Sequence, residues 1–266
     1  MAMMGFIGAG NMGYPMIRGA MKAFGTEQVI FTDVSLERRE FVKQETRLNY
    51  VSDNVSIAAA CKFIVLAVKP QFYEDVFNDI KEIITKEQVI ISIAAGVTID
   101  NVKSGLGGTV RVVRAMPNTP AMVTEGMSGV CFSQDIYNEE EKEVVDRLFS
   151  SFGQYQIFDE KLMNAVVCAN GSSPAYVYMF IEALADSVVK YGIPRDKAYT
   201  LVAQTVLGAA KMVLETKEHP GKLKDQVCSP GGTTIAAVAA LEEYGFRNAI
   251  IKATDACYER AVSLKK

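Results

Sequence analysis

The feature that most constrains the fold is a glycine-rich turn near the start of the chain, Gly8-Ala9-Gly10-Asn11-Met12-Gly13. The apolar run Met3–Ile7 precedes this turn and predicts a β-strand. Apolar residues at helical spacing follow it from Met16 to Phe24, and Pro15 stands in the first turn of that helix, where its missing N–H costs little. A strand, a glycine turn and a helix in this order predict the first unit of a parallel α/β sheet.

Each glycine of the turn suits a dinucleotide. Gly8 permits the tight turn, Gly10 lets the backbone approach a pyrophosphate, and Gly13 lets the helix pack closely on the strand. The helix N-terminus then offers free N–H groups and a favourable dipole to the phosphates. Asp33 follows Gly13 by twenty residues, at the end of the second predicted strand. We therefore expect a nicotinamide dinucleotide site; the alternative is a purely structural glycine turn.

The residues after the second predicted strand bear on whether the cofactor is NADP, which has a 2′-phosphate, or NAD, which has none. Asp33 would accept hydrogen bonds from the ribose hydroxyls and repel a 2′-phosphate. Ser35, Arg38 and Arg39 could instead hold that phosphate, or could form an ordinary solvated helix start. The prediction is that NADP is the cofactor, with NADPH favoured through an arginine, and that NAD is also used.

Further apolar runs predict strands at about 28–32, 63–68, 89–94 and 110–113. Continuous β-branched runs separated by helices are typical of a parallel sheet covered on both faces. The pattern changes near Asp159, and helices are predicted at about 160–191, 195–216, 231–243 and 246–264. The predicted fold class is α/β: a doubly wound Rossmann-type domain over residues 1–159, followed by an all-helical substrate-binding and dimerisation domain over 160–266.

Composition excludes several other classes. The 266 residues are 49% hydrophobic with a net charge of −3, which indicates neither a nucleic-acid partner nor a membrane surface. Five scattered cysteines without a CxxC pair indicate reduced thiols, and one histidine, His219, argues against a metal site. The N-terminus lacks the pattern of a signal peptide, and the uncharged stretch 162–181 is too polar to span a membrane. We expect a cytoplasmic protein.

The helical half contains segments without any charge, Ala198–Ala210 and Ser229–Leu241. A helix that is apolar all round must be buried all round, which about a hundred residues cannot achieve alone. This half is therefore predicted to form an obligate homodimer.

Two more segments carry candidate site residues. Lys69 and Pro70 directly follow the predicted strand 63–68, at the edge of the sheet where ligands bind. The alternative for Lys69 is an ordinary charged residue on the surface. Ser229-Pro230-Gly231-Gly232-Thr233-Thr234 opens an apolar helix with hydroxyls, free N–H groups and no bulky side chain. This segment suits a small carboxylate, and equally suits a helix start that is merely well capped.

Four motifs stand in order along the chain: IGAGNMG (Ile7–Gly13), Asn54 with AVKPQ (Ala67–Gln71), RAMPNTP (Arg114–Pro120) and DQVCSPGGTTIA (Asp225–Ala236). In these motifs and their order the chain resembles the pyrroline-5-carboxylate reductase family over its whole length. One segment departs from the family pattern SGSGPAY, since Asn170 and Ser173 replace a serine and a glycine.

This resemblance implies hydride transfer from NAD(P)H to 1-pyrroline-5-carboxylate, the last step of proline biosynthesis. It implies that Thr234 hydrogen-bonds the imine nitrogen as the catalytic residue and that Gly231, Gly232 and Thr233 bind the carboxylate. Gln226 of a facing subunit and Glu160 are further substrate-binding candidates. Dimers of such proteins often assemble further. The implied cofactor-binding residues are Ile7, Gly8, Ala9, Gly10, Asn11, Met12, Asp33, Ser35, Asn54, Ala67, Val68, Lys69, Pro70, Ala94 and Ala95.

Two other functions compete with this one. A β-hydroxyacid dehydrogenase shares the two-part architecture, but it needs a catalytic lysine in the helical half. Lys190, Lys197 and Lys211 lie outside any glycine-rich motif. A dinucleotide sensor without activity would need the glycine turn but not the Ser229–Thr234 segment.

Overall fold

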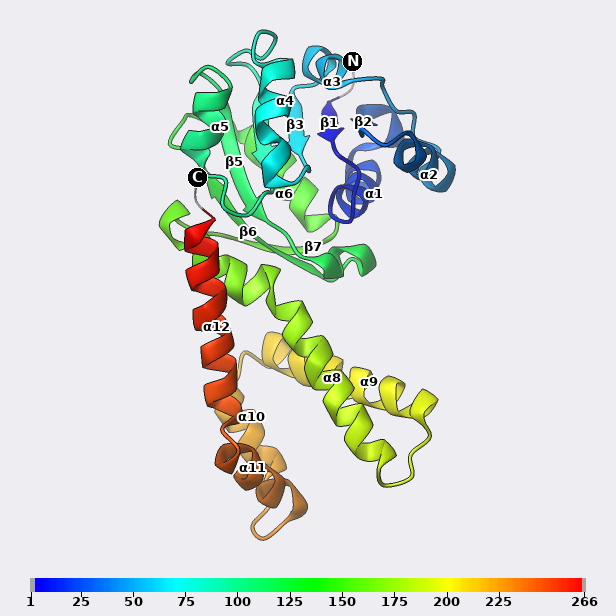
Figure 1. Ribbon diagram of the computed structural model, residues 1–266, viewed down its shortest axis with the longest axis vertical. Coiled ribbons are helices and arrows are strands. Elements are labelled where there is room, and N and C mark those ends of the chain that lie inside the picture. Colours follow the sequence, from blue (N-terminus) through cyan, green and yellow to red (C-terminus); the bar gives the residue numbers. More distant parts are fainter. Residues whose placement is uncertain (1–2, 265–266) are drawn as a thin grey trace. The chain divides into compact units, whose positions relative to one another are not determined.

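The computed structural model describes residues 3–264, and these form two compact units (Figure 1). Unit 1 extends to Ser172 and includes the end of the chain from Cys257. Unit 2 is Ser173–Ala256.

Unit 1 is built on a sheet with the strand order β2-β1-β3-β4-β5-β6-β7. The strands are β1 (Met4–Ile7), β2 (Val29–Thr32), β3 (Phe63–Leu66), β4 (Val89–Ser92), β5 (Arg111–Met116), β6 (Gly126–Phe132) and β7 (Gly153–Ile157). Neighbouring strands are parallel except β5 and β6, which run antiparallel. The predicted Rossmann-type α/β class is confirmed.

The first five strands follow the predicted apolar runs, whereas β6 and β7 were not predicted. In β6 the apolar residues are interrupted by Gly126, Ser128 and Gly129, so no continuous apolar run marks it. In β7, Gln154 and Gln156 are exposed because the strand lies at the edge of the sheet. A strand with these features is defined by its pairing and not by its own sequence.

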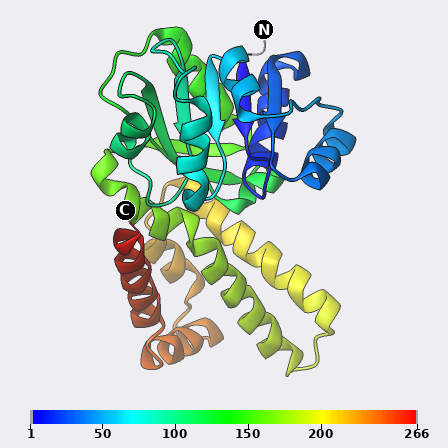
Figure 2. The same cartoon turned by 45° about the horizontal axis from the view of Figure 1, so that its top comes forward.

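Helices cover both faces of the sheet (Figure 2). One face packs against α1 (Gly13–Phe24), α2 (Leu36–Thr46) and α6 (Glu139–Ser150). The other packs against α3 (Asn54–Ala60), α4 (Tyr73–Ile80), α5 (Ile99–Gly105) and α7 (Met163–Val166). Successive strand residues alternate between the two cores: Phe6 belongs to the first and Ile7 to the second. The short helices of this unit are η1 (Thr26–Gln28), η2 (Pro70–Phe72), η3 (Thr119–Val123), η4 (Glu160–Leu162) and the π-helix η5 (Val167–Gly171).

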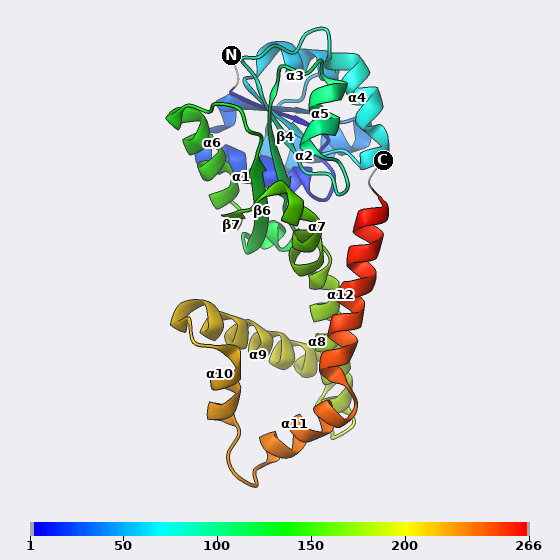
Figure 3. The same cartoon turned by 90° about the vertical axis from the view of Figure 1, so that its left-hand side faces the viewer.

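Unit 2 is helical, as predicted. Its elements are α8 (Ser173–Val189), α9 (Arg195–Thr216), α10 (Pro220–Val227), α11 (Thr233–Glu243) and the first part of α12 (Phe246–Ser263). Figure 3 shows α10 and α11 leading from α9 to α12. The short helix α10 was not predicted, and the predicted helix 160–191 is divided by the π-helix η5.

The core of unit 2 is small. Ala185 on α8 packs with Ala198 and Val202 on α9, and α11 buries none of its residues. Many large apolar side chains on these helices are exposed, among them Phe180, Leu201, Leu207, Leu214 and Ile251. Within residues 3–264, no helix has the length and the apolar character that crossing a membrane would require.

The division between the compact units falls at Ser172 and not at Asp159. The helical residues that follow Asp159 still belong to unit 1, because Met163 and Val166 pack in the second core of the sheet. A functional boundary near Asp159 remains a prediction.

Candidate active site

The carboxyl ends of β1, β3, β4 and β5 meet at one edge of the sheet, because these strands are parallel neighbours. The chain leaves β1 toward β2 on one side, and β3 lies on the other side of β1. Ligands of doubly wound sheets bind at such a point, outside the carboxyl ends of the strands. Here it is occupied by the glycine turn, with Ala67–Pro70 after β3 and Ile93–Thr98 after β4.

The glycine turn has the geometry that the sequence predicted. Gly8 has a φ of +97°, and a Cβ there would lie 2.7 Å from the Ala67 carbonyl oxygen. A Cβ on Gly13 would lie 2.3 Å from the carbonyl oxygen of Gly8. Gly8 and Gly13 are therefore required by the protein's own packing.

Gly10 differs from these two glycines. A Cβ at Gly10 would have no protein atom within 4 Å, and its φ lies outside the left-handed region. The fold itself does not require a glycine here, whereas a pyrophosphate close to the backbone would. The turn thus fits a dinucleotide. Ile7 at the end of β1 and Ala9 in the turn are buried, and Asn11 and Met12 directly precede α1.

Asp33 and Arg38 both hold the glycine turn. Asp33 accepts a hydrogen bond from Ala9 N through Oδ2 (2.7 Å) and from Ser35 N through Oδ1 (3.0 Å). Arg38 donates from Nε to the Ala9 carbonyl oxygen (2.5 Å), and its guanidinium lies over the rings of Tyr14 and Phe41. The Ser35 hydroxyl accepts from Arg38 N and caps α2. The structure therefore brings Asp33, Ser35 and Arg38 together beside the turn.

Other predicted cofactor residues lie along the same edge. The Arg39 guanidinium lies over the Tyr50 ring and donates to the Ser52 carbonyl oxygen. Asn54, the first residue of α3, donates from Nδ2 to Asp79 (2.8 Å). Lys69 and Pro70 are exposed, Ala67 and Val68 are half-buried, and the loop after β4 contains buried Ala94 and half-buried Ala95.

Glu160 forms an ion pair that the sequence did not predict. Its Oε1 accepts from Arg114 Nη1 (3.0 Å) and from Ile99 N (2.8 Å), the first main-chain nitrogen of α5. The Arg114 side chain is 3% exposed, and that of Glu160 is 33% exposed. The position of Arg114 between the apolar residues Val113 and Ala115 was the available signal for a buried cation. Its partner Glu160 lies 46 residues away, so the sequence did not indicate the pair.

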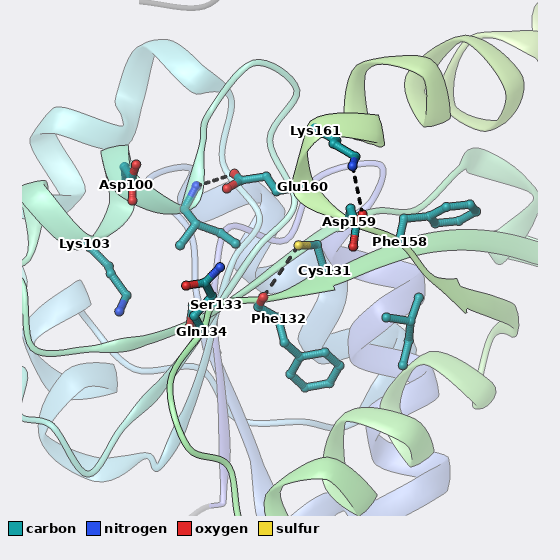
Figure 4. A pocket seen from close by; sticks show the side chains of 12 residues that line it. Asp100, Lys103, Cys131, Phe132, Ser133, Gln134, Phe158, Asp159, Glu160 and Lys161 are labelled. Atoms are coloured by element: carbon teal, nitrogen blue, oxygen red, sulfur yellow. Dashed lines mark hydrogen bonds and ion pairs between the residues drawn. The ribbon is translucent and has the colours of Figure 1, made fainter.

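A hollow of about 820 Å³ lies beside Glu160 in unit 1, between α5, the end of β6 and residues 157–161 (Figure 4). Asp100, Lys103, Cys131 and Lys161 line it together with Glu160. Burial raises the pKa of the Cys131 thiol, which keeps it protonated and unreactive near neutral pH. No residue of the glycine turn lines this hollow.

The two departures from the family motif fall in neighbouring elements: Asn170 lies in the π-helix η5, and Ser173 is the first residue of α8. The Asn170 side chain donates from Nδ2 to the Met116 carbonyl oxygen, and the main-chain carbonyl oxygen of Asn170 accepts from Asn118 Nδ2 (3.3 Å). Asn118 Oδ1 in turn accepts from Met127 N (2.8 Å). Asn170 therefore fastens the π-helix to the turn that follows β5. π-Helices are frequent at functional sites.

The predicted substrate residues lie in unit 2. Gly231 has a φ of +68°, Gly232 caps α11, and half-buried Thr234 stands in its first turn. The Gly232 N–H donates to the Ser229 carbonyl oxygen (3.0 Å), which closes the turn before α11. Gln226 is exposed near the end of α10. The substrate candidates thus belong to unit 2, except Glu160, and the cofactor candidates belong to unit 1.

Comparison with known proteins identifies the family. The family model for pyrroline-5-carboxylate reductase dimerisation matches residues 160–264, and that for coenzyme F420-dependent NADP oxidoreductases matches residues 3–96. The chain is 43% identical to the pyrroline-5-carboxylate reductase of Escherichia coli strain K12 over 265 residues, which is 98% of each protein.

Solved structures agree with this result. The pyrroline carboxylate reductase of Plasmodium falciparum, solved with NADP bound, has a TM-score of 0.89 and 34% identity and covers 100% of this chain and 98% of its own. The pyrroline-5-carboxylate reductase of Coxiella burnetii has a TM-score of 0.91 and 34% identity, with 100% and 99% covered. The chain therefore belongs to the pyrroline-5-carboxylate reductase family.

Proposed function

We propose that this protein reduces 1-pyrroline-5-carboxylate to L-proline with NADPH, the final step of proline biosynthesis, and that NADH is a second cofactor. The proposal depends on one observation: a single chain carries both an open dinucleotide turn at Gly10 and the Ser229–Thr234 motif at the start of α11. A sensor without activity would need only the turn, and a β-hydroxyacid dehydrogenase would leave the motif unexplained.

The bound reduced nicotinamide supplies a hydride, and the substrate accepts it at C5 of the imine. A protonated ring imine is already a good acceptor, so the chain needs no strong acid and has only to orient the substrate. Thr234 would hydrogen-bond the ring nitrogen and relay a proton from water to it. A neutral imine would take this proton with the hydride, and a protonated imine would take it afterwards, as the product amine. The Gly232 N–H already donates to Ser229, so the main-chain N–H groups of Gly231 and Thr233 would bind the carboxylate, with Gly232 shaping the turn. The α11 dipole would favour this, with Gln226 of a facing subunit nearby.

The residues of unit 1 would hold the cofactor. Gly8–Met12 would bind the pyrophosphate, and Asp33 and Ser35 the adenosine ribose. Arg38 or Arg39 would favour the 2′-phosphate of NADPH. Asn54, Ala67–Pro70, Ala94 and Ala95 would line the rest of the cofactor. Asp33 keeps two acceptor oxygens near the turn, which supports NADH as a second cofactor.

The assembly is proposed to be an obligate homodimer formed by the helices after Asp159, which associates further in the cytoplasm. Exposed apolar side chains on α8, α9 and α11 support this assembly, since a monomer rarely leaves so many uncovered. The family model that matches residues 160–264 is described as a dimerisation domain.

One assay tests the function. Purified protein is mixed with 1-pyrroline-5-carboxylate and NADPH, and the loss of NADPH absorbance and the appearance of proline are measured together. Equal rates of the two support the proposal. A second mixture contains a β-hydroxyacid and NADP. Turnover in that mixture alone would favour the dehydrogenase, and NADPH binding without turnover in either mixture would favour a sensor.

A further inference from the structure

Glu160 links three parts of unit 1 that are distant in sequence. Its Oε1 accepts from Arg114 in β5 and from Ile99 N at the start of α5, while Glu160 itself begins η4. Ile99 directly follows the loop Ile93–Thr98, which joins β4 to α5. Glu160 thus fixes the downstream end of this loop to the sheet.

Both donors depend on this carboxylate. Within the described residues, Nε and Nη2 of Arg114 are buried and have no hydrogen-bond partner. The bond from Nη1 to Glu160 is therefore the interaction that compensates the charge of this buried guanidinium. The Thr98 side chain is already used in a capping box with Asn101 and does not serve the Ile99 N–H. Removing Glu160 would leave a buried cation unpaired and release the start of α5.

The middle of the same loop is also held by tertiary contacts. Gly96 has a φ of +80°, and a Cβ there would lie 3.1 Å from the carbonyl oxygen of Leu264 in the last part of the chain. Ala94 is buried. The loop is therefore packed against Leu264 at Gly96 and tied to Glu160 at the residue that follows it.

The loop lies at the carboxyl end of β4, two strands from the glycine turn on β1. A dinucleotide whose pyrophosphate is bound at the turn extends along this edge, so its nicotinamide end reaches the loops after β3 and β4. The adenosine end remains beside Asp33 and β2, on the opposite side of β1.

We infer that Glu160 is a positioning residue, which acts through Ile99 and Arg114 on the loop Ile93–Thr98 and so orients the nicotinamide, and that it does not bind the substrate. The inference rests on the proposed function only in taking a nicotinamide dinucleotide as the cofactor.

The test compares two ligands that differ in the nicotinamide. Binding of NADPH and of 2′,5′-ADP, which lacks the nicotinamide half, is measured by calorimetry on the full chain. Glu160→Ala is expected to weaken NADPH binding roughly tenfold to hundredfold and to change 2′,5′-ADP binding by less than about twofold. Glu160→Gln should lie between wild type and Glu160→Ala, because its amide oxygen can still accept from Ile99 N.

Two further variants separate positioning from folding. Glu139→Ala removes a glutamate from an exposed ion pair with Lys142 and should change neither affinity. The double variant Arg114→Met/Glu160→Ala removes the buried cation together with its partner, so it avoids an unpaired charge but still frees Ile99. It should reproduce the selective loss of NADPH affinity.

Three outcomes would overturn the inference. Equal losses for NADPH and 2′,5′-ADP would mean a general structural role. Unchanged NADPH affinity with a higher KM for 1-pyrroline-5-carboxylate would assign Glu160 to the substrate. Unchanged NADPH and 2′,5′-ADP affinities together with an unchanged KM would mean that Glu160 has no role in positioning the cofactor. The binding measurements need no turnover, so they test the inference whether or not the wild-type protein reduces the imine. The KM comparison applies where it does.

Discussion

The Asp33 carboxylate accepts a hydrogen bond from the main-chain nitrogen of Ala9, at 2.7 Å, and so ties the end of β2 to the glycine turn after β1. Arg38 reaches the same residue from the other side, through the Ala9 carbonyl oxygen. The groups proposed to choose between NADH and NADPH therefore also hold the turn in shape.

Asp33→Ser is expected to raise the ratio of kcat/KM for NADPH to that for NADH, since it removes the charge that repels a 2′-phosphate. The absolute values for both should fall, because Ala9 N loses its acceptor, with an effect of about 1–2 kcal/mol. Steady-state kinetics with both cofactors measure this ratio. Asp146→Ser, on the exposed side of α6, is the matched control. An unchanged ratio would mean that Asp33 does not contact the ribose.

Gly10→Ala is expected to leave the melting temperature near that of wild type, because the new methyl group meets no protein atom. Dinucleotide affinity should fall at least about tenfold, or about 1.4 kcal/mol, because the methyl group occupies the path of the pyrophosphate. Gly8→Ala is the contrasting variant: its backbone has a φ of +97°, so it should unfold at a lower temperature. Normal NADPH binding by Gly10→Ala would place the cofactor elsewhere.

Thr234→Ala should lower kcat while NADPH affinity stays unchanged. Loss of one oriented hydrogen bond at the reacting nitrogen corresponds to roughly 1–4 kcal/mol of transition-state stabilisation. Thr234→Ser keeps the hydroxyl and should retain most of the activity. Turnover at the wild-type rate in the alanine variant would remove Thr234 from the mechanism.

Glu141 predicts a pH dependence of stability. Burial alone would raise the pKa of its carboxyl, but bonds from Lys62, Asn138 and Arg111 outweigh burial and hold the pKa below its usual value. A lowered pKa stabilises the fold above the unfolded-state pKa of about 4.3, and this contribution disappears as the pH falls through the folded-state pKa.

Glu141→Gln should therefore reduce the free energy of unfolding at pH 7 by roughly 1–3 kcal/mol, and the difference from wild type should vanish on acidification. Urea unfolding at several pH values measures it. Glu218→Gln, which alters an exposed pair with Lys222, should show neither effect. A constant difference at all pH values would contradict the role of this ion pair.

Leu207→Lys tests the assembly. Leu207 is 53% exposed on α9, so a lysine there is compatible with the fold of one chain and disrupts only an apolar interface. The variant should sediment as a monomer or precipitate, and should lose activity. Glu215→Lys adds a lysine where α9 already carries a charge and is expected to remain dimeric. A wild-type chain that is an active monomer at micromolar concentration would disprove the dimer.

Local sequence determined the elements whose signals lie within a few residues. The run before Gly8, the glycine spacing and the apolar periodicity after Gly13 were sufficient for β1, the turn and α1, because each depends on neighbouring residues. Helix α9 was predicted with the bounds Arg195–Thr216 for the same reason, since Pro194 precedes it and its residues favour helix.

Only the tertiary structure decided which distant residues meet. Strand β6 forms by pairing with β5 and β7, and β7 by pairing with β6. The contacts of Asp33 and Arg38 with Ala9 join residues 24 and 29 positions apart. Glu160 reaches Ile99 across 61 positions. The free energy of such contacts depends on burial and geometry that arise only once the chain has folded, so no local pattern of apolar and polar residues records them.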